Sequence, residues 1–288
     1  MFVTIIALED QLPLTCSRKG TCCHGNQVLL NPWEILQLAK EKNIQRNIFI
    51  QNYCEWGGVK LKFNGPENQS KKAACNLYVD NFGCSVHEGR PLACRLFPIG
   101  RQIQHQKVQY VFQGNQFPCL NGCEEVVNLP SLSVNEYLKG QLTESFETAQ
   151  DEYLEIVQNL ADVSISLLLD TELINSTLHT TLKDWRKIGL LSPEELNQQI
   201  EPIWKEYLLI PELTDYQCDV NLFTSLHNTS LLNKAQDIID KCQTIEDVYV
   251  TSLLMMKLAL YLAISVGANP IELANHWIEI AKENGAVE

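Results

Sequence analysis

The sequence lacks the short motifs that identify several large classes of enzyme. It has no GxGxxG segment following a strand, no GxxxxGK[ST], no HExxH and no GxSxG. Dinucleotide-binding, phosphate-loop, zinc-protease and α/β-hydrolase functions therefore have no support in the sequence. No general base can be recognised either, so the catalytic residues of any enzymatic activity are unknown.

Long apolar segments and export signals are also missing. The most apolar stretch, Leu253 to Val266, contains Lys257 and falls well short of the ~20 residues that a membrane helix needs. The N-terminal sequence MFVTIIALED has two acidic residues and lacks both a basic leader and a small-residue cleavage site. We therefore expect a buried helix at 253–266, no signal peptide, no membrane contact and a cytoplasmic location.

Positive charge is scarce in the second half of the chain. The protein has 22 Lys and Arg against 35 Asp and Glu, which gives a net charge of −13. Residues 1–130 contain 13 basic and 10 acidic side chains, and the remainder contains 9 and 25. An acidic surface repels phosphate backbones, and the small basic excess of the first part is too weak to attract them. We predict no nucleic-acid binding.

Cysteine is rare after residue 123 and dense before it. Of the eleven cysteines, only Cys218 and Cys242 lie in the second part. Disulfides would explain such density in a secreted protein, but the sequence has no export signal and the total is odd. Clustered thiols in a reducing compartment favour metal binding instead. We expect Cys54, Cys218 and Cys242 to be packed thiols that bind no metal.

The texture of the sequence changes near residues 125–130. Before this point we expect a helix at 32–53 after Asn31-Pro32, strands at 57–65 and 108–113, and otherwise turn-rich sequence that cannot pack a core unaided. Beyond it we expect helices at 134–160, 161–183, 193–207, 219–241, 245–266 and 270–284. The sequence thus predicts a mainly α fold, with a small irregular, cysteine-rich α+β module at 1–128 stapled by metal and an acidic helical domain at 129–288.

Three cysteine segments carry the strongest signal. The first is Cys16-Ser-Arg-Lys-Gly-Thr-Cys22-Cys23-His24, and the last is Cys119-Leu-Asn-Gly-Cys123. Between them, residues 84–98 read Cys-Ser-Val-His-Glu-Gly-Arg-Pro-Leu-Ala-Cys-Arg-Leu-Phe-Pro. From residue 16 to about 123 the chain resembles the YkgJ-type cysteine-cluster family, the CxxCxxCC zinc- or iron-chelating domain. It is similar as well to the cysteine-rich region of flagellin lysine N-methylases.

The resemblance implies that a set of thiolates holds the metal. The expected ligands are Cys16, Cys22, Cys23, Cys75, Cys84 and Cys94, with Cys119 and Cys123 as further candidates. The second cysteine of the CxxCxxCC pattern falls at Lys19 here. Either that position is not an essential ligand, or another cysteine replaces it, or part of the site has been lost.

Other residues near these cysteines suit a thiolate site. Arg90 and Arg95 could offset the negative charge of several sulfurs or donate hydrogen bonds to them. His24 and His87 are candidate imidazole ligands, although both also suit an ordinary polar loop. The tight backbone that close sulfur packing needs is supplied by Gly20, Gly25 and Gly83.

The number of thiols bears on the kind of metal. Six matched cysteines exceed the four ligands that close a structural zinc site, so we predict a polynuclear or double site. We favour an iron–sulfur cluster over zinc, because a cluster spreads the charge of several sulfurs over more atoms.

Three functions follow from this reading. The first is a metal-binding protein that serves structure, metal handling or assembly with a protein partner. The alternative is an S-adenosylmethionine-dependent protein-lysine N-methyltransferase resembling flagellin lysine N-methylases and acting on a protein substrate. The third is a helical interaction protein whose metal only staples its N-terminal module.

Overall fold

A computed structural model describes residues 4–12, 20, 23–68, 71–104, 107–112, 131–175, 180–211 and 219–287. Over these residues the fold is mainly α with a small α+β part, which confirms the predicted fold class. The chain divides into two compact units, described in turn below. Unit 1 comprises Met1–Val28, Leu36–Tyr53 and Leu61–Glu147, and unit 2 comprises Leu29–Ile35, Cys54–Lys60 and Thr148–Glu288.

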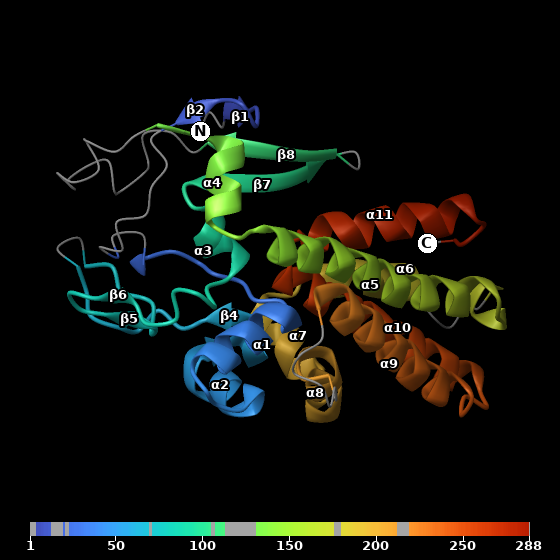
Figure 1. Ribbon diagram of the computed structural model, residues 1–288. Coiled ribbons are helices and arrows are strands. Elements are labelled where there is room, and N and C mark those ends of the chain that lie inside the picture. The colour runs from blue at the N-terminus through green and yellow to red at the C-terminus, as the bar shows by residue number, and fades with distance from the viewer. Residues whose placement is uncertain are drawn as a thin grey trace. The chain divides into compact units, whose positions relative to one another are not determined.

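Unit 1 contains most of the short strands and several small helices (Figure 1). Its strands are β1 (Thr4–Ile6), β2 (Gln11–Leu12), β5 (Tyr78–Val79), β6 (Gly83–Cys84), β7 (Ile99–Gln104), β8 (Lys107–Phe112) and β9 (Leu132–Ser133). Its helices are α2 (Arg46–Tyr53), α3 (Leu92–Leu96) and α4 (Val134–Gly140). Helices α1 (Pro32–Glu41) and α5 (Glu144–Leu169) have residues in both units.

The largest sheet of unit 1 is antiparallel, with the strand order β1-β8-β7. Its register places Tyr110 of β8 opposite Ile6 of β1 on one side and Arg101 of β7 on the other. Strand β8 confirms the strand predicted at 108–113, whereas β7 and β1 were not expected from the sequence.

Unit 2 is helical (Figure 1). Besides most of α5 it contains α6 (Thr181–Gly189), α7 (Pro193–Gln199), α8 (Pro202–Leu209), α9 (Val220–Ile239), α10 (Ile245–Ser265) and α11 (Pro270–Glu283). Two segments from the first part of the chain belong to it as well, and they include β3 (Cys54–Glu55) and the 3₁₀ turn η2 (Trp56–Gly58). The N–H of Leu30 joins these segments by a hydrogen bond of 2.9 Å to the carbonyl of Val59.

Helix α10 forms the centre of the unit 2 core. Its residues 258–263 are fully buried, and so are Trp185 of α6 and Trp277 of α11. The hydroxyl of Tyr261 donates to the carbonyl of Trp56 at 2.7 Å. Among the described residues, α10 is the helix with the length and apolar composition to cross a membrane, and 67% of that window is buried inside the protein. This burial is the pattern of a core helix and confirms the buried helix predicted at 253–266.

The helix starts predicted at 134, 193 and 270 are confirmed. Ser133 caps α4 and Ser192 caps α7, each in a capping box with the glutamate three residues later. Asn269 caps α11, which then begins at Pro270. These side chains satisfy backbone N–H groups that the first helical turn leaves without partners. Helix starts can therefore be recognised in the sequence from their capping residues.

The predicted lengths of several helices are wrong, because their ends carry no strong sequence signal. The helix predicted at 32–53 is two helices, separated where Asn43 adopts a φ of 54°. The helix predicted at 134–160 breaks after α4, where Leu142 adopts a φ of 53°. At both breaks the next N–H bonds a carbonyl five residues back, which is the Schellman pattern. Glycine usually occupies this left-handed position, so a leucine there does not indicate the end of a helix.

Two further boundaries differ from prediction. The helix predicted at 161–183 does not exist as one element, since α5 runs on to Leu169 and α6 begins at Thr181. The helix predicted at 193–207 is α7 and α8, because Pro202 lacks an N–H and starts a new helix.

One predicted strand of the cysteine-rich part is shorter than expected. The strand expected over 57–65 is reduced to β4 (Lys60–Leu61), since 56–58 form the turn η2 instead. The two compact units also interleave along the sequence, and unit 1 continues to Glu147. The division into a module at 1–128 and a domain at 129–288 stays a prediction.

Candidate metal centre

Cys23 and Cys75 are held together by main-chain hydrogen bonds within unit 1. The N–H of Cys75 donates to the carbonyl of Cys23 at 2.7 Å, and the N–H of Gly25 donates to the carbonyl of Ala73 at 3.0 Å. Between these bonds, His24 and Ala74 form an antiparallel bridge. The two predicted ligands are therefore brought side by side although 52 positions separate them in the sequence.

The loop before Cys23 packs on the ring of Tyr78. Gly20 has a φ of 72°, and a Cβ added there would lie 2.1 Å from Cε2 of Tyr78. The carbonyl of Gly20 accepts a hydrogen bond of 2.8 Å from the N–H of Cys23. The His24 ring meets the Tyr78 ring edge-on, with centroids 5.0 Å apart. Glycine at position 20 is thus required by both backbone conformation and space.

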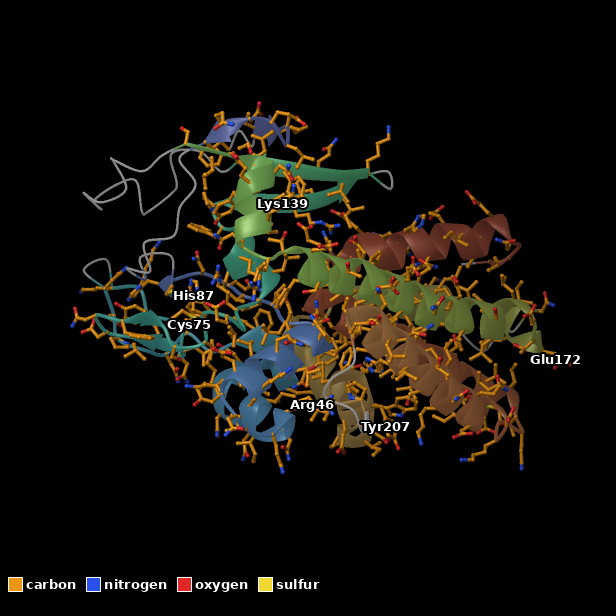
Figure 2. All side chains as sticks on the ribbon, in the orientation of Figure 1. Arg46, Cys75, His87, Lys139, Glu172 and Tyr207 are labelled. Carbon is orange, nitrogen blue, oxygen red and sulfur yellow. The ribbon has the colours of Figure 1, made fainter. Side chains whose placement is uncertain are left out.

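A short hairpin presents the next pair of cysteines. Strands β5 and β6 pair with Tyr78 opposite Cys84. The N–H of Tyr78 donates to the carbonyl of Cys75 at 2.9 Å, which turns the chain from Cys75 into the hairpin. Figure 2 labels Cys75 in this part of unit 1. The turn and the hairpin together bring Cys84 back towards Cys75.

The Cys75 and Cys84 thiols interact electrostatically. Burial raises the pKa of the Cys75 thiol to about 11, and negative charge on Cys84 adds to this rise. The backbone N–H of Leu77 donates to the Cys75 sulfur and acts in the opposite direction, because it favours the thiolate. Cys75 and Cys84 are both partly buried, and two such thiols with an N–H directed at one sulfur suit a cation that displaces the protons.

Cys94 lies on α3, a short helix that starts after Pro91. The N–H groups of Cys94 and Arg95 both donate to the carbonyl of Pro91 at 3.0 Å. Cys94 is the exposed member among the described cysteines of unit 1. The helix therefore fixes the backbone at Cys94 and leaves its side chain accessible.

Arg95 is almost completely buried and braces the turn before α3. Its Nε donates to the carbonyl of Arg90 at 2.8 Å, its Nη1 to the carbonyl of Gln141 at 2.7 Å, and its Nη2 to the carbonyl of Glu88. Its guanidinium carbon stacks 4.0 Å from the centroid of the Phe146 ring. These contacts give Arg95 a structural role in holding the turn. Its predicted role beside the cysteine sulfurs stays a prediction.

Arg90 acts on the same turn. Its Nη1 donates to the carbonyl of His87 at 2.7 Å and lies at the same distance from both ring nitrogens of His87. Its Nη2 donates to Oε1 of Gln141. Nδ1 of His87 also lies 3.1 Å from Oε1 of Glu88, so this imidazole already has polar partners within the turn.

His24 is better placed than His87 to bind a metal. Its Nδ1 lies 3.0 Å from the carbonyl oxygen of Gly20, which can only accept a hydrogen bond. Nδ1 therefore carries the proton, and the lone pair is on Nε2. A ring nitrogen fixed in this way by a carbonyl is typical of histidines that ligate metals.

The structure covers only part of the predicted ligand set. Cys16, Cys22, Cys119, Cys123 and the departing Lys19 lie outside the described residues, as does Cys218. Cys54 is buried, and Cys242 donates to the carbonyl of Ile238, both as expected of packed thiols. In the described part of the chain, no three Cys, His, Asp or Glu side chains are grouped closely enough to hold a metal.

Sequence reasoning missed Gln141, Tyr78 and Phe146. Gln141 and Phe146 lie beyond the cysteine motifs, and nothing in their local sequence indicates that arginines from 90 and 95 reach them. Tyr78 lies in the motif region, three residues after Cys75, and a tyrosine there could have been read as a packing partner for Gly20.

Comparison with known proteins identifies one part of the chain. Residues 15–112 match the model of a family described as "CxxCxxCC: Putative zinc- or iron-chelating domain". Neither a curated protein nor a solved structure gives a significant match to the chain. The matched residues include Cys23, Cys75, Cys84 and Cys94, whose surroundings are described above. Residues 15–112 of this chain therefore form a cysteine-cluster domain of the CxxCxxCC family.

Proposed function

We propose that this protein binds a metal through thiolates of its cysteine-cluster domain, with Cys23, Cys75 and Cys84 at the centre of the ligand set. The observation that carries the proposal is the backbone geometry that gathers these cysteines: the N–H of Cys75 donates to the carbonyl of Cys23 at 2.7 Å, and the hairpin places Cys84 opposite Tyr78. Thiolates gathered at one site repel each other unless a cation lies between them. A bound metal converts that repulsion into ligation.

The surroundings of Cys75 support the same proposal. Burial keeps the thiol protonated while no metal is bound, and the N–H of Leu77 directed at its sulfur favours the thiolate once a metal is present. The backbone bond to Cys23 holds a third sulfur-bearing residue next to the pair. Cys16, Cys22 and Cys94 are proposed to complete the set, with Cys119 and Cys123 as further donors.

The proposed occupant is an iron–sulfur cluster in preference to zinc. Six thiols in matched positions exceed the four that a structural zinc takes. An iron–sulfur cluster would supply electron-transfer chemistry or structural stability, and hydrogen bonds to its sulfurs would tune it. The N–H of Leu77 is one such donor.

Metal analysis of single-cysteine variants tests the proposal. The full-length protein is purified without oxygen, and its zinc, iron and acid-labile sulfide are measured for wild type, Cys75→Ser, Cys84→Ser and Cys242→Ser. Cys242 is the matched control, because its sulfur bonds the Ile238 carbonyl at 3.6 Å and the Thr251 hydroxyl at 3.4 Å, and serine can bond both groups. Loss of metal in the first two variants but not the third supports the proposal. Full metal content in all four rejects it.

The methyltransferase alternative rests on resemblance alone. Calorimetric titration of the metal-loaded protein with S-adenosylmethionine separates it from a binding function. Saturable binding would favour the methyltransferase, and its absence favours a protein that only holds metal.

A further inference from the structure

Two buried arginines of the cysteine segment meet at one residue beyond it. Arg90 and Arg95 are 7% and 3% exposed, so both guanidinium groups are removed from water. The side-chain oxygen of Gln141 accepts from Arg90, and the carbonyl oxygen of Gln141 accepts from Arg95. Gln141 lies 29 positions after the end of the family match at residue 112.

The same arginines donate hydrogen bonds to backbone carbonyls of the turn between Cys84 and Cys94. Arg90 binds the carbonyl of His87, while Arg95 binds those of Glu88 and Arg90. A buried guanidinium is stable only when its N–H groups are satisfied, so each donor bond fixes the position of its acceptor. The turn therefore adopts the shape that the two arginines impose, and Gln141 anchors both arginines.

Gln141 is itself held rigidly at the end of α4. Its N–H donates to the carbonyl of Tyr137 at 2.9 Å, and its own carbonyl is one that the helix leaves without an internal partner. An arginine is a favourable partner for such a carbonyl, because it lies at the negative end of the helix. A second link joins the same elements, since the hydroxyl of Tyr137 donates to the carbonyl of Phe97 at 2.7 Å. Both ends of the Arg90–Phe97 segment are thus tied to α4.

We propose that Gln141 is a positioning residue for the metal site: through Arg90 and Arg95 it fixes the segment that carries Cys84 and Cys94. The inference rests on the proposed function and extends it, because it assigns part of the metal-holding fold to residues outside the matched domain. Gln141 does not bind the metal. It sets the spacing of two of the cysteines that do.

The test compares three substitutions in the full-length protein. Gln141→Ala removes the acceptor of Arg90 and keeps the carbonyl that binds Arg95. Gln141→Glu retains an acceptor oxygen at the same place and should restore the contact. Gln150→Ala is the matched control, because Gln150 is a glutamine of α5 whose side-chain amide donates to a backbone carbonyl within unit 2, that of Val266 at 3.0 Å.

Two readouts are taken, namely the rate of metal loss to a chelator and the amide hydrogen exchange of residues 84–98. We expect Gln141→Ala to lose metal about tenfold faster than wild type and to exchange faster over 84–98, while the other two variants behave as wild type. Equal rates in Gln141→Ala and wild type would overturn the inference. If wild type holds no metal, the proposed function fails, and hydrogen exchange alone then decides whether Gln141 positions the segment.

Discussion

The main-chain N–H of Cys75 donates a hydrogen bond of 2.7 Å to the carbonyl oxygen of Cys23. Together with the bond from the N–H of Gly25 to the carbonyl of Ala73, it links Cys23 to Cys75, and the hairpin that follows carries Cys84 back towards Cys75. The link is made by backbone atoms, so it does not depend on the identity of the proposed metal. Changes that disturb it should therefore affect metal binding through geometry.

Gly20→Ala is expected to disturb this link. An alanine there would need a left-handed φ and would place its Cβ 2.1 Å from the Tyr78 ring. We expect a loss of more than about 1 kcal/mol in unfolding free energy and reduced metal retention, measured by thermal unfolding and metal analysis.

Gly140→Ala is the control for that substitution. Gly140 ends α4 and has open space around the position of a new Cβ. Alanine there should be neutral or stabilising by up to about 1 kcal/mol. A Gly20→Ala protein as stable and as metal-rich as the Gly140→Ala protein would contradict the packing of this loop on Tyr78.

Tyr153→Phe is expected to destabilise unit 2. The Tyr153 hydroxyl lies 2.8 Å from Nδ1 of His227, and both side chains are fully buried. The other ring nitrogen of His227 donates to the carbonyl of Tyr207 at 2.8 Å, so Nδ1 is the acceptor. Removing the hydroxyl leaves a buried acceptor unsatisfied at a cost of about 1–3 kcal/mol. Chemical denaturation should show this loss, whereas an unchanged midpoint would contradict the hydrogen bond.

Acid should weaken unit 2 through Asp184. Burial alone would raise the pKa of Asp184, but hydrogen bonds from Lys187, Tyr249 and Thr180 outweigh burial and lower it below the ordinary 3.8. The stabilisation is fully present above pH 3.8 and is lost as the pH falls through the lowered folded-state pKa. Asp184→Asn should remove this dependence, so its stability loss below pH 4 should be shallower than that of wild type. Parallel curves for the two proteins would contradict the assignment.

Some of these features could be predicted from the sequence and others could not. Helix starts are visible because Ser133, Ser192 and Asn269 cap them with their own side chains. The break at Leu142 is hidden, because leucine rarely adopts a left-handed conformation and tertiary contacts impose it. The cysteine motif names Cys23 and Cys75 as candidate ligands, and the structure places their backbones side by side. It cannot predict Gln141, because the bonds from Arg90 and Arg95 form across about fifty residues of chain.

The helical unit should keep its fold when metal is removed. Its core is built from its own helices, with residues 258–263 of α10 fully buried. Chelation should therefore leave most of the helical circular dichroism signal in place while protease sites open in the cysteine-cluster domain. Loss of all helical signal on chelation would contradict this independence.

The most direct measurement of the central claim is the metal and sulfide content of anaerobically purified protein, taken together with its visible absorption spectrum. The account predicts a coloured protein with iron and acid-labile sulfide, whose content falls when Cys75 or Cys84 is changed to Ser and stays constant in Cys242→Ser. A colourless protein with neither iron nor zinc would contradict metal binding. A colourless protein with one zinc per chain would contradict the cluster.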